Sequence, residues 1–124
     1  MDSKKLAHLC RDYADNKKGE NIVVLDVRKL STVTDYFVIC TGSSEPHVRA
    51  IVNEISDRLR EEHNERAHRP EGAERATWVV LDYFDVIVHV MRADVRRQYN
   101  LEALWGDAAP LKPRKKAVRK IKES

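Results

Sequence analysis

Asp82 and Asp85 are the residues whose type and spacing most directly suggest chemistry, because they flank a tight turn between two predicted strands. Two carboxylates at such a turn could hold a divalent metal ion. Gly42 and Ser43 lie between a predicted strand and a predicted helix, where backbone N–H groups can bind a phosphate. Together these four residues outline a site for a nucleotide and a metal ion, as in a metal-dependent nucleotidyltransferase or a nucleotide-binding enzyme.

The ordinary roles of the same residue types weaken that hypothesis. Aspartates are common in tight turns, and a Gly-Ser pair before a helix is a frequent capping sequence. The chain also has no Gly-x-x-x-x-Gly-Lys segment that would grip a phosphate. We therefore favour a protein without catalytic activity and keep an active enzyme as the alternative hypothesis.

The histidines and cysteines do not form a metal-binding pattern. None of the five histidines has metal-ligand spacing with Cys10 or Cys40. Both cysteines lie in apolar stretches, which predicts buried, protonated thiols in a reducing compartment. The sequence therefore predicts neither a metal site nor a cofactor.

A β-hairpin is predicted over residues 77–91, with its turn at the junction of residues 83 and 84. This pairing would place Trp78 opposite His89 and Asp82 opposite Asp85. One face of the hairpin would then carry Trp78, Val80, Asp82, Asp85, Ile87 and His89, with Met91 beyond them. That mixture is typical of a partner interface, whereas the opposite face is nearly all aliphatic and is expected in the core. The other interpretation is that a helix covers the first face and Trp78 completes the core.

The elements around the hairpin follow from hydrophobic periodicity and capping residues. Helices are predicted to start at Ser3, at Ser43 or Ser44, and at Ala93, the last continuing as a helical finish to Trp105. The predicted strands span residues 21–27, 35–41, 77–83 and 84–91. Residues 61–76 are polar and are expected to contain no sizeable core element.

The resulting order is α-β-β-α-β-β-α. Amphipathic helices must bury their apolar stripes against a sheet, so we expect a single α/β (α+β) domain whose mixed β-sheet is packed by helices. The connection from the second strand through the second helix to the third strand resembles a crossover. The last two strands would pair as a hairpin.

Length and composition agree with one domain, since the chain has 124 residues, of which 42% are hydrophobic and 35% charged. No apolar run approaches the roughly 20 residues that a membrane span requires. The first residues lead into a helical pattern without a signal-peptide core. We therefore expect a cytoplasmic protein with no membrane contact.

The charge is divided unevenly along the chain. Residues 110–124 hold seven basic groups and one acidic group, a net charge of +6, whereas residues 1–109 hold 16 basic and 19 acidic groups, a net charge of −3. We expect a folded domain over 1–109 and a disordered basic tail over 110–124. The tail is either a solubilising extension or an arm that contacts a polyanion such as ribosomal RNA. The residues of that arm would be Lys112, Arg114, Lys115, Lys116, Arg119 and Lys120.

Three segments carry a resemblance to a known family. They are residues 35–44 (DYFVICTGSS), 78–91 (WVVLDYFDVIVHVM) and 99–105 (YNLEALW). In this order and at this spacing they resemble the ribosomal silencing factor family RsfS, also called Iojap. The resemblance covers about residues 3–108 and leaves out the basic tail.

The resemblance implies a nucleotidyltransferase-like fold that lacks the catalytic activity of that superfamily. Members of the family bind the large-subunit ribosomal protein numbered fourteen and block the joining of the small subunit, which represses translation. Positions matching Trp78 and Tyr83 belong to the family's contact surface, and we expect Tyr83 to be exposed at the tip of the turn. The predicted partner-binding residues are Trp78, Asp82, Tyr83, Phe84, Asp85, His89, Met91, Arg92 and Arg97.

Phe84 departs from the family pattern, which usually has glycine before the second hairpin aspartate. The turn therefore either needs a positive φ from a poorly suited residue or adopts another turn type. Phe84 would also add apolar contact area.

Two other functions of the chain stay open. One is a homodimer through the hairpin face, and the other is a general RNA-binding module that uses the basic tail.

Overall fold

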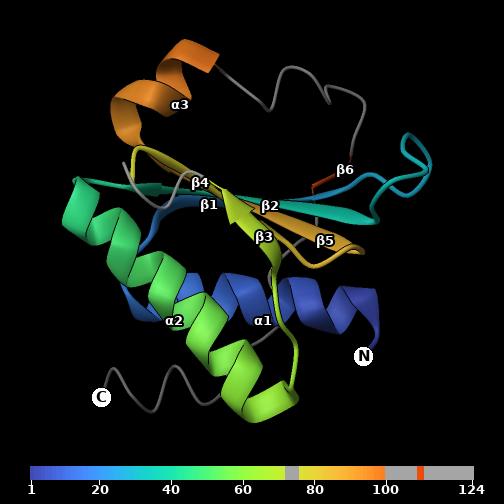
Figure 1. Ribbon diagram of the computed structural model, residues 1–124. Coiled ribbons are helices and arrows are strands. Elements are labelled where there is room, and N and C mark those ends of the chain that lie inside the picture. Colours follow the sequence, from blue (N-terminus) through green and yellow to red (C-terminus); the bar gives the residue numbers. More distant parts are fainter. Residues whose placement is uncertain (72–75, 100–108, 111–124) are drawn as a thin grey trace, which may run out of the picture.

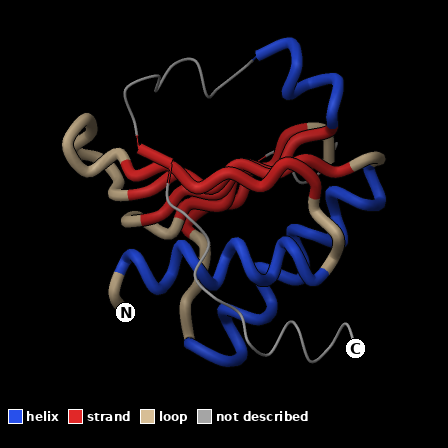
Figure 2. The backbone as a smooth tube through the Cα atoms, turned by 180° about the vertical axis from the view of Figure 1, so that it is seen from behind, coloured by secondary structure: helices blue, strands red, loops and turns tan. Residues whose placement is uncertain are grey.

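The computed structural model describes residues 1–71, 76–99 and 109–110, and in this part of the chain a mixed sheet of six strands lies between two layers of helices. Helices α1 (Ser3–Asn16) and α2 (Glu45–His63) cover one face, and α3 (Ala93–Tyr99) lies over one end of the other face (Figure 1). The view from behind shows the same three layers (Figure 2). The predicted mixed sheet packed by helices is thus confirmed.

The sheet has the strand order β3-β4-β5-β2-β1-β6. Its strands are β1 (Glu20–Asp26), β2 (Tyr36–Gly42), β3 (His68–Glu71), β4 (Trp78–Asp82), β5 (Val86–Arg92) and β6 (Ala109–Pro110). Strand β2 runs parallel to β5, and the other neighbouring pairs are antiparallel. The chain that leaves β2 through α2 enters β3 at the edge of the sheet, and the parallel neighbour of β2 is β5, the second strand of the hairpin. The first strand of the hairpin, to which the crossover was predicted to lead, lies one position farther from β2.

Capping side chains define where both long helices begin. Asp2, rather than the predicted Ser3, accepts a hydrogen bond from the backbone N–H of Lys5 at 3.3 Å. Ser44 accepts one from the N–H of His47 at the same distance, and so satisfies a donor that the first turn of α2 leaves unpaired.

The core lies between the sheet and the two long helices. The predicted apolar stripe of α2 is buried throughout, and it consists of Val48, Ile51, Val52, Ile55 and Leu59. The aliphatic face of the hairpin packs against the same layer, since Val79, Leu81, Val86, Val88 and Val90 are all buried. A second, smaller cluster of Leu25, Val27, Ile39 and Met91 lies on the α3 side of the sheet.

Two short strands were missed by the sequence analysis. Strand β3 lies within the polar segment 61–76 and pairs with β4 at the edge of the sheet. Strand β6 pairs with β1, so that Pro110, the first residue of the predicted tail, lies beside Leu25. Both strands are short and polar or proline-containing, so they lack the alternating hydrophobic pattern by which strands are predicted. Residues 101–105, predicted as helical, and residues 111–124 lie outside the described residues.

Candidate partner-binding face

Trp78, His89 and Phe37 come from three neighbouring strands and lie together on the α3 side of the sheet. The indole N–H of Trp78 donates to Nδ1 of His89 at 3.0 Å. The ring centroid of His89 lies 6.0 Å from that of Trp78 and 5.6 Å from that of Phe37, with tilted planes in both pairs. The sheet thus holds the three rings in fixed positions, with all three only partly buried.

His89 is an uncharged member of this aromatic group. Burial lowers the pKa of its imidazole from 6.5 to about 4, because the charged form would lose its hydration. A neutral ring whose Nδ1 accepts the Trp78 hydrogen bond carries its proton on Nε2. His89 therefore acts as a hydrogen-bond acceptor for Trp78 at neutral pH and brings no charge to this face.

The register of the hairpin differs from the prediction by two residues. Trp78 pairs with Met91, and Asp82 pairs with Ile87, so three residues instead of none separate the two strands. A shift of two keeps every side chain on its predicted face, because side chains alternate with a period of two. It moves Asp85 out of the strand into the turn, and the expected Asp82–Asp85 pairing is therefore wrong.

Two predicted contact residues are buried in the free protein. Tyr83 is 4% exposed, lies in the core beneath the sheet, and is not at the exposed tip of the turn as predicted. Burial also raises the pKa of its phenol. Met91 is fully buried in the cluster on the α3 side. Tyr83 therefore supports the face from the other side of the sheet, and Met91 supports it from beneath Trp78 on the α3 side.

Phe84 and Asp85 are the exposed residues of the turn. Phe84 is 63% exposed and has a φ of 67°, the left-handed conformation that glycine would adopt most easily. Its ring lies 5.2 Å from the ring of His68. Of the two alternatives predicted for this turn, the structure has the positive φ at Phe84, and the aromatic side chain faces outward.

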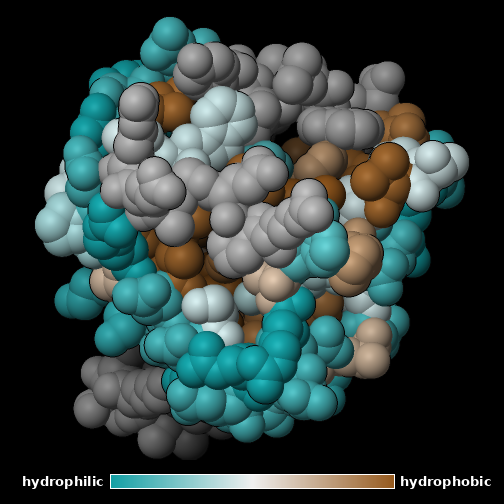
Figure 3. Space-filling model, viewed as in Figure 1, coloured by the Kyte–Doolittle hydropathy of each residue, from teal (hydrophilic) through white to brown (hydrophobic). Residues whose placement is uncertain are grey.

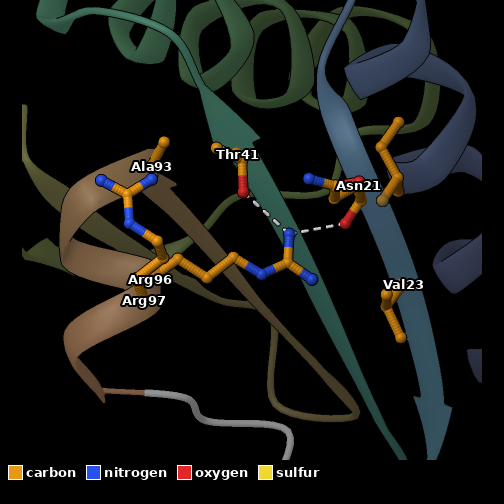
Figure 4. Close-up of a pocket in the computed structure, with 7 residues that line it drawn as sticks. Asn21, Val23, Thr41, Ala93, Arg96 and Arg97 are labelled. Atoms are coloured by element: carbon orange, nitrogen blue, oxygen red, sulfur yellow. Dashed lines mark hydrogen bonds between the residues drawn. The ribbon is translucent and has the colours of Figure 1, made fainter.

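Arg92, Arg96 and Arg97 come from the end of β5 and from α3. Arg92 pairs with Asp94 at 2.7 Å, and the hydrogen bond from Arg92 lowers the pKa of this carboxyl to about 2. Arg96 reaches across the end of the sheet and donates to the carbonyl oxygen of Asn21 at 2.6 Å and to Oγ1 of Thr41 at 2.8 Å (Figure 4). The predicted partner-binding residues include Arg97 and not Arg96, yet Arg96 is the residue that fastens α3 to the sheet.

An open pocket of about 940 Å³ lies beside that contact. Its described lining residues are Asn21, Ile22, Val23, Thr41, Ala93, Arg96 and Arg97, so its charges are all positive. Arg97 extends toward Ala93, away from the bonded Arg96 group (Figure 4). The two guanidinium groups therefore do not converge on one point.

Apolar side chains also reach the surface elsewhere on the protein. Figure 3 shows hydrophobic atoms between the hydrophilic surface of α2 and the upper part of the molecule, and again at the right-hand edge. Figure 1 draws the loop between β1 and β2 at that edge, and this loop contains the exposed Leu30 and Val33. The loop and the hairpin turn meet at one end of the sheet, since the N–H of Asp35 donates to the carbonyl oxygen of Asp85 at 2.9 Å.

The four residues of the alternative nucleotide site are not brought together. In the parallel pair β2 and β5, Tyr36 lies beside Val86 and Gly42 beside Arg92. Gly42 and Asp85 are thus at opposite ends of the sheet, about 20 Å apart by the rise of a strand. Among the described residues, no group of three or more His, Cys, Asp and Glu side chains could hold a metal ion.

In the turn between β2 and α2, the backbone N–H that could bind a phosphate already donates to a side chain of this chain. The N–H of Ser43 donates to Nδ1 of His47 at 2.8 Å, and Nε2 of His47 lies 2.8 Å from the carbonyl oxygen of Lys17. Oγ of Ser43 is 3.1 Å from the same Nδ1, as in a serine–histidine dyad. Because the single lone pair of Nδ1 already accepts the Ser43 N–H, His47 is poorly placed to act as a base toward this hydroxyl.

Cys10 and Cys40 are buried free thiols, as predicted. Burial raises the pKa of Cys40 to about 12 and that of Cys10 further, so neither is a thiolate at neutral pH.

Within the described part of the chain, no helix is both long enough and apolar enough to cross a bilayer.

The chain is similar to a family model and to proteins that carry the same family name. The family model described as ribosomal silencing factor during starvation, RsfS, matches residues 1–124. Two proteins named ribosomal silencing factor RsfS, from Halalkalibacterium halodurans and Bacillus subtilis, are each 43% identical over 108 residues, which is 87% of this chain and 92% and 91% of those proteins. A crystal structure of a Chromobacterium violaceum protein superposes with a TM-score of 0.82 at 33% identity and covers 94% of this chain and 97% of that one.

Proposed function

Because the chain belongs to the ribosomal silencing factor family, we propose that it binds the large ribosomal subunit through ribosomal protein fourteen and thereby blocks the joining of the small subunit. The observation that carries the proposal is the aromatic group on the α3 side of the sheet. Trp78 is the type of residue that most often anchors a protein interface, and its ring is already fixed by His89. A partner therefore meets a preorganised surface and loses little side-chain entropy on binding.

The contact surface runs along β4 from Trp78 to the turn. Trp78 supplies the apolar anchor near α3, and Asp82, Phe84 and Asp85 form the opposite end. Arg92 and Arg97 form the polar rim beside α3, whereas Tyr83 and Met91 stabilise the surface from within. His89 supports Trp78 and stays uncharged.

This mechanism requires no covalent step. The bound protein acts by occupying space at the subunit interface, so repression follows from binding alone. We infer a cytoplasmic location because the partner is the ribosome. The same face could pair two copies of the protein when no ribosome is present, which would compete with ribosome binding.

Trp78→Ala tests the assignment in a co-sedimentation experiment with isolated large subunits. The wild type should bind stoichiometrically, and addition of small subunits should then yield few joined ribosomes. Truncation of a true anchor should cost about 2 kcal/mol or more, which is a loss of about thirtyfold in affinity. The variant should correspondingly restore subunit joining.

Leu9→Ala provides the matched control for folding. Leu9 is a partly buried apolar residue on α1, on the opposite side of the sheet. This substitution should lower stability while leaving binding to large subunits unchanged. Equal binding by the wild type and Trp78→Ala, with both proteins folded, would show that the face is wrongly assigned.

A further inference from the structure

The turn between β4 and β5 holds Phe84 in a conformation that is unfavourable for this residue. Its φ is 67°, and the N–H of Asp85 donates to the carbonyl oxygen of Tyr83 at 2.8 Å. A positive φ at the centre of a three-residue hydrogen-bonded turn marks the rarer form of the γ-turn, which strains any residue with a Cβ. Glycine would adopt this turn without the same penalty.

The surrounding structure enforces the turn through several contacts. The N–H of Phe84 donates to Oδ1 of Asp82 at 2.8 Å. The carbonyl oxygen of Asp85 accepts the N–H of Asp35 at 2.9 Å, and the ring of Tyr83 is buried in the core. Strained conformations persist where neighbours over-determine them in this way, and they concentrate at functional sites.

The side chain of Phe84 gains little from the fold in return. It is 63% exposed, and the ring contact that it makes among the described residues is with His68, at a centroid distance of 5.2 Å and an interplanar angle of 38°. An exposed aromatic residue at a position suited to glycine is thus unfavourable for the free protein in both backbone and side chain. A contact outside the chain would account for it.

The charges around the ring indicate the chemistry of that contact. The turn carries two carboxylates, Asp82 and Asp85, and Asp35, which is bonded to the turn, lies near Arg28. Such a surface repels the phosphates of naked RNA and complements basic side chains. The occupant that fits is a basic protein surface with an apolar depression for the ring.

We propose that Phe84 is a specificity-determining anchor that inserts into an apolar depression on the ribosomal protein, while Asp82 and Asp85 face basic side chains around it. This inference rests on the proposed function. It adds a second anchor in the turn beyond β4, a strand that spans about 13 Å from Trp78 to Asp82, so that the protein grips its partner at both ends of the strand.

Phe84→Gly tests the proposal because its two expected effects have opposite directions. The melting temperature should rise by about 4 °C as the turn relaxes. Affinity for isolated large subunits, and for purified ribosomal protein fourteen, should fall by at least about tenfold. A residue with a purely structural role would not combine higher stability with weaker binding.

Two further variants separate the backbone from the ring. Phe84→Ala keeps the Cβ, so it should weaken binding with little change in melting temperature. Lys18→Gly relieves another positive φ, of 60°, in the turn between α1 and β1 at the opposite end of the sheet. It should raise the melting temperature like Phe84→Gly and leave affinity unchanged.

The outcomes distinguish this inference from the proposed function. If Trp78→Ala loses binding while both Phe84 variants bind like the wild type, the Phe84 anchor is wrong and the proposed function stands. If the wild type itself fails to bind large subunits, the proposed function is wrong. If Phe84→Gly instead weakens binding to protein-free ribosomal RNA, the partner at the turn is RNA and the inference is overturned.

Discussion

His89 is a histidine whose role follows from its surroundings. Between the rings of Trp78 and Phe37 it is held uncharged, with a pKa of about 4, and it accepts the indole hydrogen bond of Trp78. Strand alternation predicted that His89 shares a face with Trp78. It could not predict the loss of charge, which depends on burial among the neighbouring strands.

Burial of His89 should make stability depend on pH between about 6.5 and 4. The unfolded chain takes up this proton near pH 6.5 but the folded protein only near pH 4, so in this window the unfolded state binds more protons. The free energy of unfolding is therefore highest above pH 6.5 and should fall by at most about 3 kcal/mol as pH decreases to 4. Urea unfolding at a series of pH values measures this fall.

His89→Asn is the matched variant, because its side-chain oxygen can still accept from Trp78 but does not titrate. The decrease between pH 6.5 and 4 should largely disappear in this variant. Carboxyls with lowered pKa values, such as Asp94, lose their contribution only below about pH 4 and should be unaffected. An unchanged pH profile would show that His89 is hydrated in the folded protein.

At the scale of whole elements, the patterns with the strongest periodicity were predicted well. The stripe of α2 and the two faces of the hairpin are where periodicity placed them. The register of the hairpin was wrong because the turn is centred one residue later, on Phe84 and Asp85, which requires a positive φ at Phe84 that residue preferences argue against. Tyr83 was consequently misplaced, since it lies opposite Val86 and continues the core-facing alternation of Val79 and Leu81.

The junction between β2 and α2 depends on the absence of a side chain at Gly42. A Cβ there would lie 2.7 Å from Cγ2 of Val48 and 2.9 Å from its backbone nitrogen. Gly42→Ala should therefore push α2 away from the sheet and lower the free energy of unfolding by about 2 kcal/mol. Chemical denaturation measures the loss.

A double-mutant cycle with Val48→Ala tests the stated cause. Removing Cγ2 relieves the closest contact but leaves the backbone one, so the two substitutions should be partly compensating rather than additive. Strict additivity, or a loss below about 0.5 kcal/mol for Gly42→Ala alone, would mean that the helix moves away without strain.

On the scale of the whole molecule, the charge distribution separates two kinds of contact. Residues 1–109 carry a net charge of −3 and include the acidic turn, whereas residues 110–124 carry +6. The sequence alone revealed this division, but it could not show which surface the domain uses, because that depends on how the sheet is covered. An acidic domain suits a basic ribosomal protein, and a basic segment suits ribosomal RNA nearby.

The basic segment should make binding to large subunits more sensitive to salt. Replacing its six predicted contact residues by glutamine keeps the length of the full chain, and these residues are Lys112, Arg114, Lys115, Lys116, Arg119 and Lys120. If about four of them neutralise phosphates, the slope of log affinity against log salt should become shallower by about three. Affinity should fall at low salt and converge with that of the wild type at high salt.

Trp78→Ala should lower affinity by a similar factor at every salt concentration, because an apolar anchor releases no counterions. Equal slopes for the wild type and the glutamine variant would show that the segment does not contact RNA in the complex.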